Sequence, residues 1–508
     1  MILKLFPQRP DHPLADAKEF KRILAELHVD KAAKAVDELV GWFESLQHAE
    51  NFRLDHYFDV LRQLDDAGQQ HLRNLVRDYL DSPQLSTLER QRLWELSFAY
   101  WNVVAGRYSA CIQRARIDPK GRGTDAFNAS LALAEVRLQA ARRSCLKWLA
   151  YRYESASRDF WKAFGRSFLA AEGAGHAQKS VQLYPGQAGS SSVAQQYLHA
   201  LVFFASAMDG LLPQQIELAD RVITHFVPSF ICSSDCRPDS LYRVDAASGS
   251  PPARLASHPQ ATRSSLRYVS TGPALPALEE LIHVVERDEV PVGVNLGGGY
   301  SQKALLQVLR HLRIYWALQP PKRRHQRHAV KAKMAVVHGF DRSYALFSGM
   351  APHPEISTGT RNWMVENVSR GGFRVCFDAS AGERIRIGAL LCMQPEGGDN
   401  WLLGTARRLN KLDGRANLGI QVLSRQAQSV ELRPRRSGFS AAVANPGIYL
   451  HDGGEPGVAR IVLPLGGFNV RETLDCSLDG SAHRLTPVEV ESSGVDYEIA
   501  RFHDQLLG

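Results

Sequence analysis

This chain of 508 residues contains no long hydrophobic run. No segment approaches the roughly 20 apolar residues that a helix needs to cross a bilayer. The first residues, MILKLFPQRPDHP, lack the apolar core and the small-residue cleavage site of a signal peptide. We therefore expect a cytoplasmic protein without a membrane span.

Cysteine is also scarce. Seven thiols are spread over the chain, which does not make a disulfide framework, and we expect them to be reduced. The close pair Cys232 and Cys236, with His225 upstream, lacks the second pair of ligands that a zinc site requires. We predict no metal site and interpret these thiols as buried or loop residues.

Catalytic signatures are missing as well. The motifs HExxH and GxSxG do not occur, and the SxxK pair Ser144 and Lys147 has no SDN or KTG partner. The glycine-rich segment GVNLGGGYSQK lacks the GK[ST] ending of a phosphate-binding loop, so we interpret it as a linker followed by a helix cap at Ser301. The sequence therefore predicts a protein that is not an enzyme and has no cofactor.

Acidic residues are absent from one particular stretch. The net charge of the chain is +8, and Asp and Glu do not occur from Val290 to Phe340. The excess positive charge is concentrated there, which indicates a binding surface for an anion. Its nine cations are Lys303, Arg310, Arg313, Lys322, Arg323, Arg324, Arg327, Lys331 and Lys333.

The periodicity of apolar residues predicts a multidomain α+β protein. Helical spacing dominates the N-terminal part, where Val36, Leu39, Val40 and Phe43 form one stripe. After Pro321 the pattern changes to about six short strands in roughly 100 residues, typical of a small antiparallel barrel. We expect an all-helical domain at 1–170, a linker at 171–192, a helical region at 193–319 with an irregular connector at 236–276, a six-stranded barrel at 320–430 and a small C-terminal β domain at 438–508.

Two further helical predictions are specific. Ser86 and Glu89 are spaced as a capping box that opens a helix. A long helix is expected from Phe127 towards Phe168. Inside the predicted barrel, we expect no helix between the strands.

The most informative pattern is an ordered pair of motifs. KRRHQRHAV contains Arg323 and Arg327 four positions apart, and ENVSRGGFRV contains Asn367 and Ser369 between two strand-like runs. Guanidinium groups bind phosphate bidentately and stack on purines, so the first motif suits a nucleotide. Gly372, in the second motif, permits a close approach of the backbone.

In this order and on six strands, RxxxR followed by NxSxxG resembles the PilZ family. The resemblance implies a receptor for cyclic di-GMP, with arginines that contact its phosphates and stack on guanine, and with Asn and Ser that bind guanine and an adjacent phosphate. It also implies that the helical region relays the signal to an unknown protein partner. The residues carried over are Arg323, Arg324, Arg327, Asn367, Ser369 and Gly372.

Three alternatives stay open or are set aside. The barrel could be a degenerate fold used for protein–protein interaction, or the basic stretch could bind polyanions in general, although nucleic acid is not expected because few aromatics lie beside the cations. EGGDNW resembles the GGD start of the diguanylate cyclase signature, but the following Glu-Phe is missing and we predict a turn. The sequence does not indicate the regulated process, the oligomeric state or the ligand stoichiometry.

Overall fold

The computed structural model divides the chain into two compact units. Unit 1 comprises Met1–Met208 and Pro213–Pro320, and unit 2 comprises Pro321–Gly508 with the short segment Asp209–Leu212. The structure describes residues 10–27, 31–49, 51–82, 84–187, 189–256, 263–289, 294, 296, 299–319, 325–350, 361–379, 385–435, 444–452 and 455–507.

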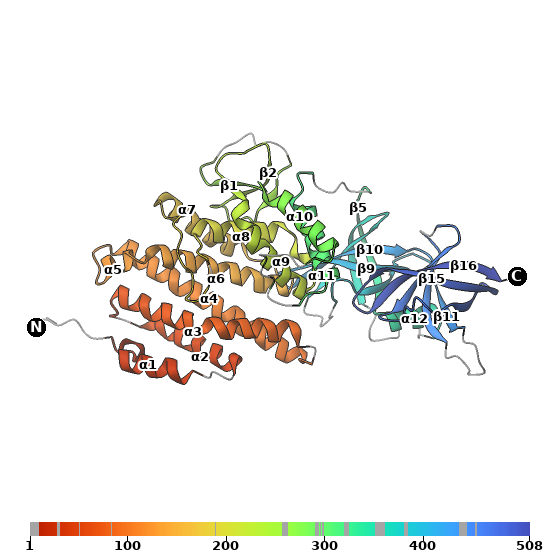
Figure 1. Ribbon diagram of the computed structural model, residues 1–508, viewed down its shortest axis with the longest axis horizontal. Helices are drawn as coiled ribbons and strands as arrows, with labels where there is room; N and C mark the ends of the chain where they lie inside the picture. Colours follow the sequence, from red (N-terminus) through yellow and green to blue (C-terminus); the bar gives the residue numbers. More distant parts are fainter. Residues whose placement is uncertain are drawn as a thin grey trace, which may run out of the picture. The chain divides into compact units, whose positions relative to one another are not determined.

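Unit 1 is mainly helical, and Figure 1 shows its long helices α3, α4 and α6 alongside one another. The predicted stripe is confirmed, because Val36, Leu39 and Phe43 on α2 are fully buried. Apolar residues at helical spacing thus form the core between neighbouring helices. The α-helices are α1 (Ala17–Glu26), α2 (Ala32–Ser45), α3 (Leu54–Asp81), α4 (Thr87–Ile117), α5 (Thr124–Asn128), α6 (Leu131–Tyr151), α7 (Arg158–Gly173), α8 (Val193–Ala205), α9 (Pro213–Phe226), α10 (Ala274–Glu286) and α11 (Gln302–Trp316).

The capping box is confirmed at the start of α4. The Ser86 hydroxyl accepts from the Glu89 N–H, and the Glu89 carboxylate accepts from the Ser86 N–H. The prediction of one long helix from Phe127 towards Phe168 was wrong, because the chain is divided there into α5, α6 and α7. Tyr153 has a left-handed backbone conformation, with φ of 60°, which ends α6, and the Ser157 hydroxyl caps α7.

The glycine- and serine-rich segment after α7 is irregular, but it is not exposed throughout. Tyr184 is buried, with its ring beneath the guanidinium of Arg137 at 4.6 Å. Further along, strand-like runs form a four-stranded sheet in the order β1-β4-β2-β3. Its strands are β1 (Ile231–Ser233), β2 (Ser240–Asp245), β3 (Ala253–Arg254) and β4 (Leu266–Ser270).

Unit 2 begins with a closed six-stranded antiparallel barrel, the first barrel. Its strands follow one another around the barrel in the order β5-β6-β7-β10-β9-β8. The EGGDNW segment is the turn between β8 and β9, as predicted. The strands are β5 (His328–His338), β6 (Arg361–Ser369), β7 (Gly372–Asp378), β8 (Leu390–Pro395), β9 (Leu402–Leu412) and β10 (Arg415–Ser424).

A second closed barrel of six antiparallel strands follows, which we call the second barrel. Its strand order is β11-β12-β13-β16-β15-β14, so the two barrels have the same connectivity: strands one, two and three, then six, five and four. The strands are β11 (Ala427–Pro434), β12 (Asn445–Leu450), β13 (Val458–Pro464), β14 (Leu474–Leu478), β15 (Ser481–Ser493) and β16 (Tyr497–Leu507). The predicted fold class, helical region followed by β domains, is confirmed.

An apolar core joins the two barrels. Strand β8 is buried on both faces, because Leu391 lies on one side while Leu390 and Cys392 join a cluster with Ile448 and Ile499 of the second barrel. Apolar residues on both faces of a strand indicate that both faces are covered. The barrels therefore form one unit with a shared core.

The expectation of no helix between the first barrel's strands was wrong. Helix α12 (Phe340–Phe347) lies between β5 and β6 and contacts strands of both barrels, β5 and β8 as well as β11 and β12. Its first residue, Phe340, is buried in the shared core, and the Phe340 N–H donates to the carboxylate of Asp496 at 2.8 Å. The helix is stable there because the second barrel covers its apolar side.

None of the helices in the described ranges combines the length and apolar composition required to cross a lipid bilayer.

Candidate nucleotide-binding site

The second motif forms a tight hairpin between β6 and β7. Ser369 pairs with Gly372, so only Arg370 and Gly371 form the turn. A Cβ on Gly372 would lie 2.0 Å from the carbonyl oxygen of Ile420 on β10, which makes glycine necessary at that position. The Ser369 hydroxyl donates to the Gly372 carbonyl at 3.3 Å. Asn367 and Ser369 are half-buried.

Part of the first motif lies outside the described residues, which include neither Arg323 nor Arg324. Arg327 is described and exposed, directly before β5, and makes no hydrogen bond or ion pair with any other described residue. Its guanidinium is therefore available to a ligand, as far as the described part of the chain shows.

The register of the sheet brings the two motifs together. On β5 and β6, His328 pairs with Val368 and Ala329 pairs with Asn367. The same antiparallel register, continued by one residue, places Arg327 opposite Ser369. His325 lies over the hairpin turn, since a Cβ on Gly371 would be 3.3 Å from its ring. Segments 40 positions apart in the sequence therefore meet at one end of β6.

The strand pairing also reveals residues that the sequence did not single out. Arg374 pairs with Asn367 on one side and with Gly419 on the other, and Gly419 pairs with Arg408 of β9. Arg374 and Arg408 are exposed, while the alternate residues Val375 and Leu418 are buried. These residues therefore form a row on the outer face of the barrel. Gly419 stands between the two arginines in this row.

Period-two alternation after Gly372 could have identified Arg374 as an outward residue. Arg408 could not have been found in that way, because it comes from another hairpin and only the pairing of β9 with β10 places it in this row.

A further arginine supports the hairpin turn. The Arg425 guanidinium, from the segment between β10 and β11, donates to the carbonyl oxygen of Arg370 at 3.0 Å. The same hairpin contains one ion pair, between Arg374 Nε and Glu366 Oε2 at 2.9 Å. Arg425 thus holds the turn by its backbone.

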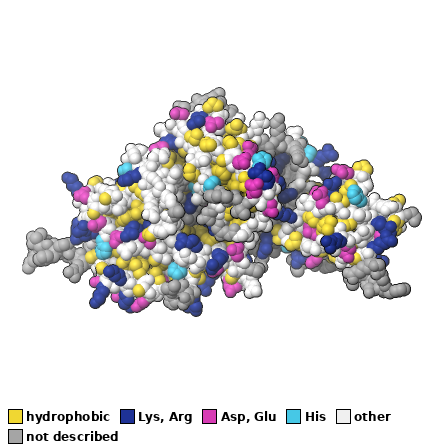
Figure 2. Space-filling model, in the orientation of Figure 1, with side chains coloured by type: hydrophobic (Ala, Val, Ile, Leu, Met, Phe, Trp, Pro, Cys, Tyr) yellow, Lys and Arg dark blue, Asp and Glu magenta, His cyan; other side chains and the backbone are white. Residues whose placement is uncertain are grey.

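This outer face offers the groups that a nucleotide needs. Guanidinium groups can bind phosphate and stack on a purine, and an Asn amide and a Ser hydroxyl can form hydrogen bonds with a base edge. Across the face drawn in Figure 2, Lys and Arg side chains are interspersed with Asp and Glu rather than gathered into one continuous basic surface. Among the described residues, no group of three or more His, Cys, Asp and Glu side chains is placed to hold a metal ion.

Comparison with known protein families gives a match to the N-terminal part of the chain. Residues 18–237 match the family described as the cyclic-di-GMP receptor FimW, N-terminal domain. No curated protein matches the chain. The matched range runs from α1 to the residues after β1 and ends before the two barrels. The N-terminal region is thus similar to a domain of a cyclic-di-GMP receptor, and the match does not extend to the hairpin described above.

Proposed function

We propose that this chain is a cytoplasmic receptor for cyclic di-GMP and not an enzyme, and that the first barrel binds the dinucleotide. The observation that carries the proposal is the meeting of the two motifs: His325 lies against Gly371, and His328, directly after Arg327, pairs with Val368, directly before Ser369. The N-terminal match supports the same ligand from a different part of the chain, because that family is described as a cyclic-di-GMP receptor.

The proposed roles follow from side-chain chemistry. Arg323, Arg324 and Arg327 contact the phosphates and stack on guanine, because a guanidinium group is planar and permanently charged. Asn367 and Ser369 form hydrogen bonds with a guanine edge and a neighbouring phosphate. Gly372 provides the close approach of β7 to β10 and contributes no side chain.

The helical region is proposed to relay the signal to a protein partner. The ligand shifts an equilibrium between two conformations only if it binds one of them more tightly. The arginines before β5 would contact the dinucleotide directly, so these contacts are the differential interaction that the relay needs.

Calorimetric titration of the full chain with cyclic di-GMP tests the proposal. We expect micromolar or tighter binding that is lost or strongly weakened in Asn367→Ala and Ser369→Ala. Ser477→Ala is the matched control, because Ser477 is an exposed residue of β14 in the second barrel. No binding by the unmodified chain, or equal binding in both site variants, would refute the proposal.

The same titration separates this function from general polyanion binding. Affinity for a polyanion falls steeply with salt, because bound cations are released, and is insensitive to Ser369→Ala. A barrel used only for protein–protein interaction would bind neither cyclic di-GMP nor a polyanion.

A further inference from the structure

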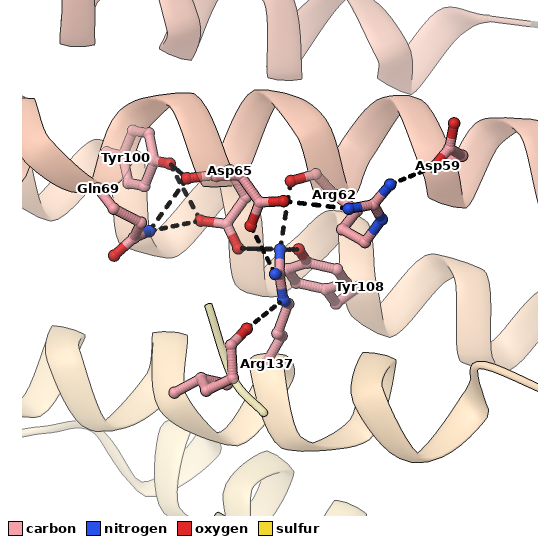
Figure 3. A network of polar contacts seen from close by, with 9 residues as sticks. Asp59, Arg62, Asp65, Gln69, Tyr100, Tyr108 and Arg137 are labelled. Carbon is pink, nitrogen blue, oxygen red and sulfur yellow. Dashed lines mark hydrogen bonds and ion pairs between the residues drawn. The ribbon is translucent and has the colours of Figure 1, made fainter. Parts of the chain in front are cut away.

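Helix α6 in unit 1 has polar residues on two faces, and the first face is fully paired. Arg137 is 2% exposed, and its guanidinium binds the carboxylates of Asp65 at 3.3 Å and Asp66 at 2.6 Å. It also meets the Tyr108 hydroxyl and the carbonyl of Leu183. Figure 3 shows this network between the helices. Its charges compensate one another, as buried ions in a folded protein must.

The second face of α6 lines a cavity of about 290 Å³ between α4, α6 and α7. The α6 residues on it, Glu135, Gln139 and Arg142, are four and three positions apart and share one side of the helix. Arg116 on α4 and Arg166 on α7 line the same cavity. Three helices therefore turn polar residues toward a common space, where packed helices usually present apolar ones.

The positive charge of this cavity is only partly compensated. Arg116 pairs with Glu135 at 3.3 Å. Arg142 binds the carbonyl of Ala163 at 2.8 Å and the Ser167 hydroxyl at 2.5 Å, but no described carboxylate forms an ion pair with it. Burial lowers the pKa of Arg142 to about 10, so the group is still charged at neutral pH.

Arg166 adds a second uncompensated cation. It is exposed at the mouth of the cavity and forms no hydrogen bond or ion pair with any other described residue. With one acid against three arginines, the lining carries an excess of positive charge that an anion would balance.

Gln139 provides an independent sign of a missing ligand. It is 1% exposed, and its amide nitrogen donates to the Ser167 hydroxyl at 3.0 Å. Among the described residues its amide oxygen has no hydrogen-bond partner, and a buried acceptor without a partner is costly. A molecule in the cavity that carries an N–H or O–H group could donate to it.

We propose that this cavity is a second ligand site, separate from the first barrel, for a small phosphate ester. The phosphate would bind Arg142 and Arg166, and a hydroxyl or amino group of the ester would donate to Gln139. The volume of about 290 Å³ is at the lower limit of small-molecule sites. It suits a mononucleotide with one phosphate, one sugar and one base, whereas a cyclic dinucleotide with two of each is too large.

The test is calorimetric titration of the full chain with three probes: inorganic phosphate, guanosine 5′-monophosphate and uncharged guanosine. We expect the monophosphate to bind with a dissociation constant below about 1 mM, inorganic phosphate to bind more weakly, and guanosine not to bind. The substitutions Arg142→Gln and Arg166→Gln should each lower the affinity for the monophosphate at least tenfold. Arg158→Gln is the matched control, because Arg158 is an exposed residue at the start of α7 and does not line the cavity.

Two further arms keep the result unambiguous. Ser369→Ala should leave monophosphate binding unchanged, and Arg166→Gln should leave cyclic di-GMP binding and the melting temperature unchanged. The proposal is overturned if the monophosphate does not bind or if both cavity variants bind it normally. It is also overturned if Arg158→Gln lowers the affinity for the monophosphate as much as the cavity variants do. Loss of monophosphate binding in Ser369→Ala would overturn it as well, because that result would place the monophosphate at the first barrel.

Discussion

The two barrels of unit 2 have the same strand connectivity but different surroundings at the corresponding hairpin. In the first barrel, the hairpin of strands two and three contains Asn367 and Ser369, and a basic segment precedes strand one. In the second barrel, the corresponding connection follows β12 and contains Asp452. The Asp452 carboxylate accepts from the Ser424 hydroxyl and from the Arg425 N–H, so it binds a neighbouring segment of the protein.

The segment before strand one also differs. Only Arg425 and Gln426 separate β10 from β11. The second barrel therefore has no counterpart of the basic segment that precedes β5 in the first barrel. The barrel is therefore a scaffold, and its connectivity alone does not make a nucleotide site. The proposed site depends on the basic residues before β5, a glycine-containing hairpin and the polar row on the outer face of the first barrel.

The largest expected effect comes from removing the second barrel. A chain that ends at Arg425 would expose Leu390, Leu403 and Phe340, which lie in the shared core. We expect the first barrel not to fold, measured as loss of near-ultraviolet circular dichroism and of cyclic di-GMP binding. Leu485→Ala is the control: it makes a cavity inside the second barrel only and should cost about 2–5 kcal/mol without removing the fold. A folded, ligand-binding truncated chain would show that the barrels are independent.

The next effect is on affinity. Replacement of Arg327 by Ala removes a charged donor from the basic segment before β5, and hydrogen bonds to charged groups contribute about 1.5–3 kcal/mol. We expect cyclic di-GMP affinity to fall roughly 10- to 150-fold in calorimetry. Arg433→Ala removes an exposed arginine from β11 of the second barrel and should change affinity less than about twofold. Equal losses of affinity in the two variants would mean that the net charge of the protein, and not the position of Arg327, determines binding.

Two glycines of the first barrel should differ in their tolerance of a methyl group. A Cβ on Gly372 would meet the backbone oxygen of Ile420 at 2.0 Å, whereas one on Gly419 would meet Arg408 Cβ at an ordinary 3.5 Å. We expect Gly372→Ala to lower the free energy of unfolding by about 1–3 kcal/mol. Gly419→Ala should change it by less than about 0.5 kcal/mol. Urea denaturation measures both, and similar values for the two would contradict this description of the hairpin.

The smallest effect concerns Asp452 in the second barrel. Burial raises its pKa, but hydrogen bonds from Ser424 and from the backbone of Arg425 and Gln426 lower it more, so the net shift is downward. A lowered pKa stabilises the fold above the ordinary value of about 4, and this stabilisation is lost as the pH falls through the lowered pKa. Asp452→Asn should therefore cost about 1 kcal/mol at pH 7.

Urea denaturation of both proteins at several pH values checks this direction. The difference between the Asp452→Asn variant and the unmodified chain should shrink as the solution becomes strongly acidic. A difference that grows toward acid pH would have the wrong sign.

The local features of this protein follow from short stretches of its sequence. Helical stripes such as that of Val36, Leu39 and Phe43, the Ser86 cap and most strands of the first barrel follow from residue period and turn chemistry, which act over a few positions. The order of the two motifs could also be read directly. Strand β15 was not predicted, because its largely polar and exposed residues lack a clear alternation.

The way in which distant segments meet follows from the tertiary fold and not from any local pattern. Several features depend on contacts between residues far apart in the chain. They are the place of α12, the core around Leu390 and Ile448, the outer row of Arg374, Gly419 and Arg408, and the cavity beside Arg142. A charged residue in a sequence looks the same whether a partner lies opposite it or not. Pairing and burial across elements determine which charges are compensated, and no local pattern contains that information.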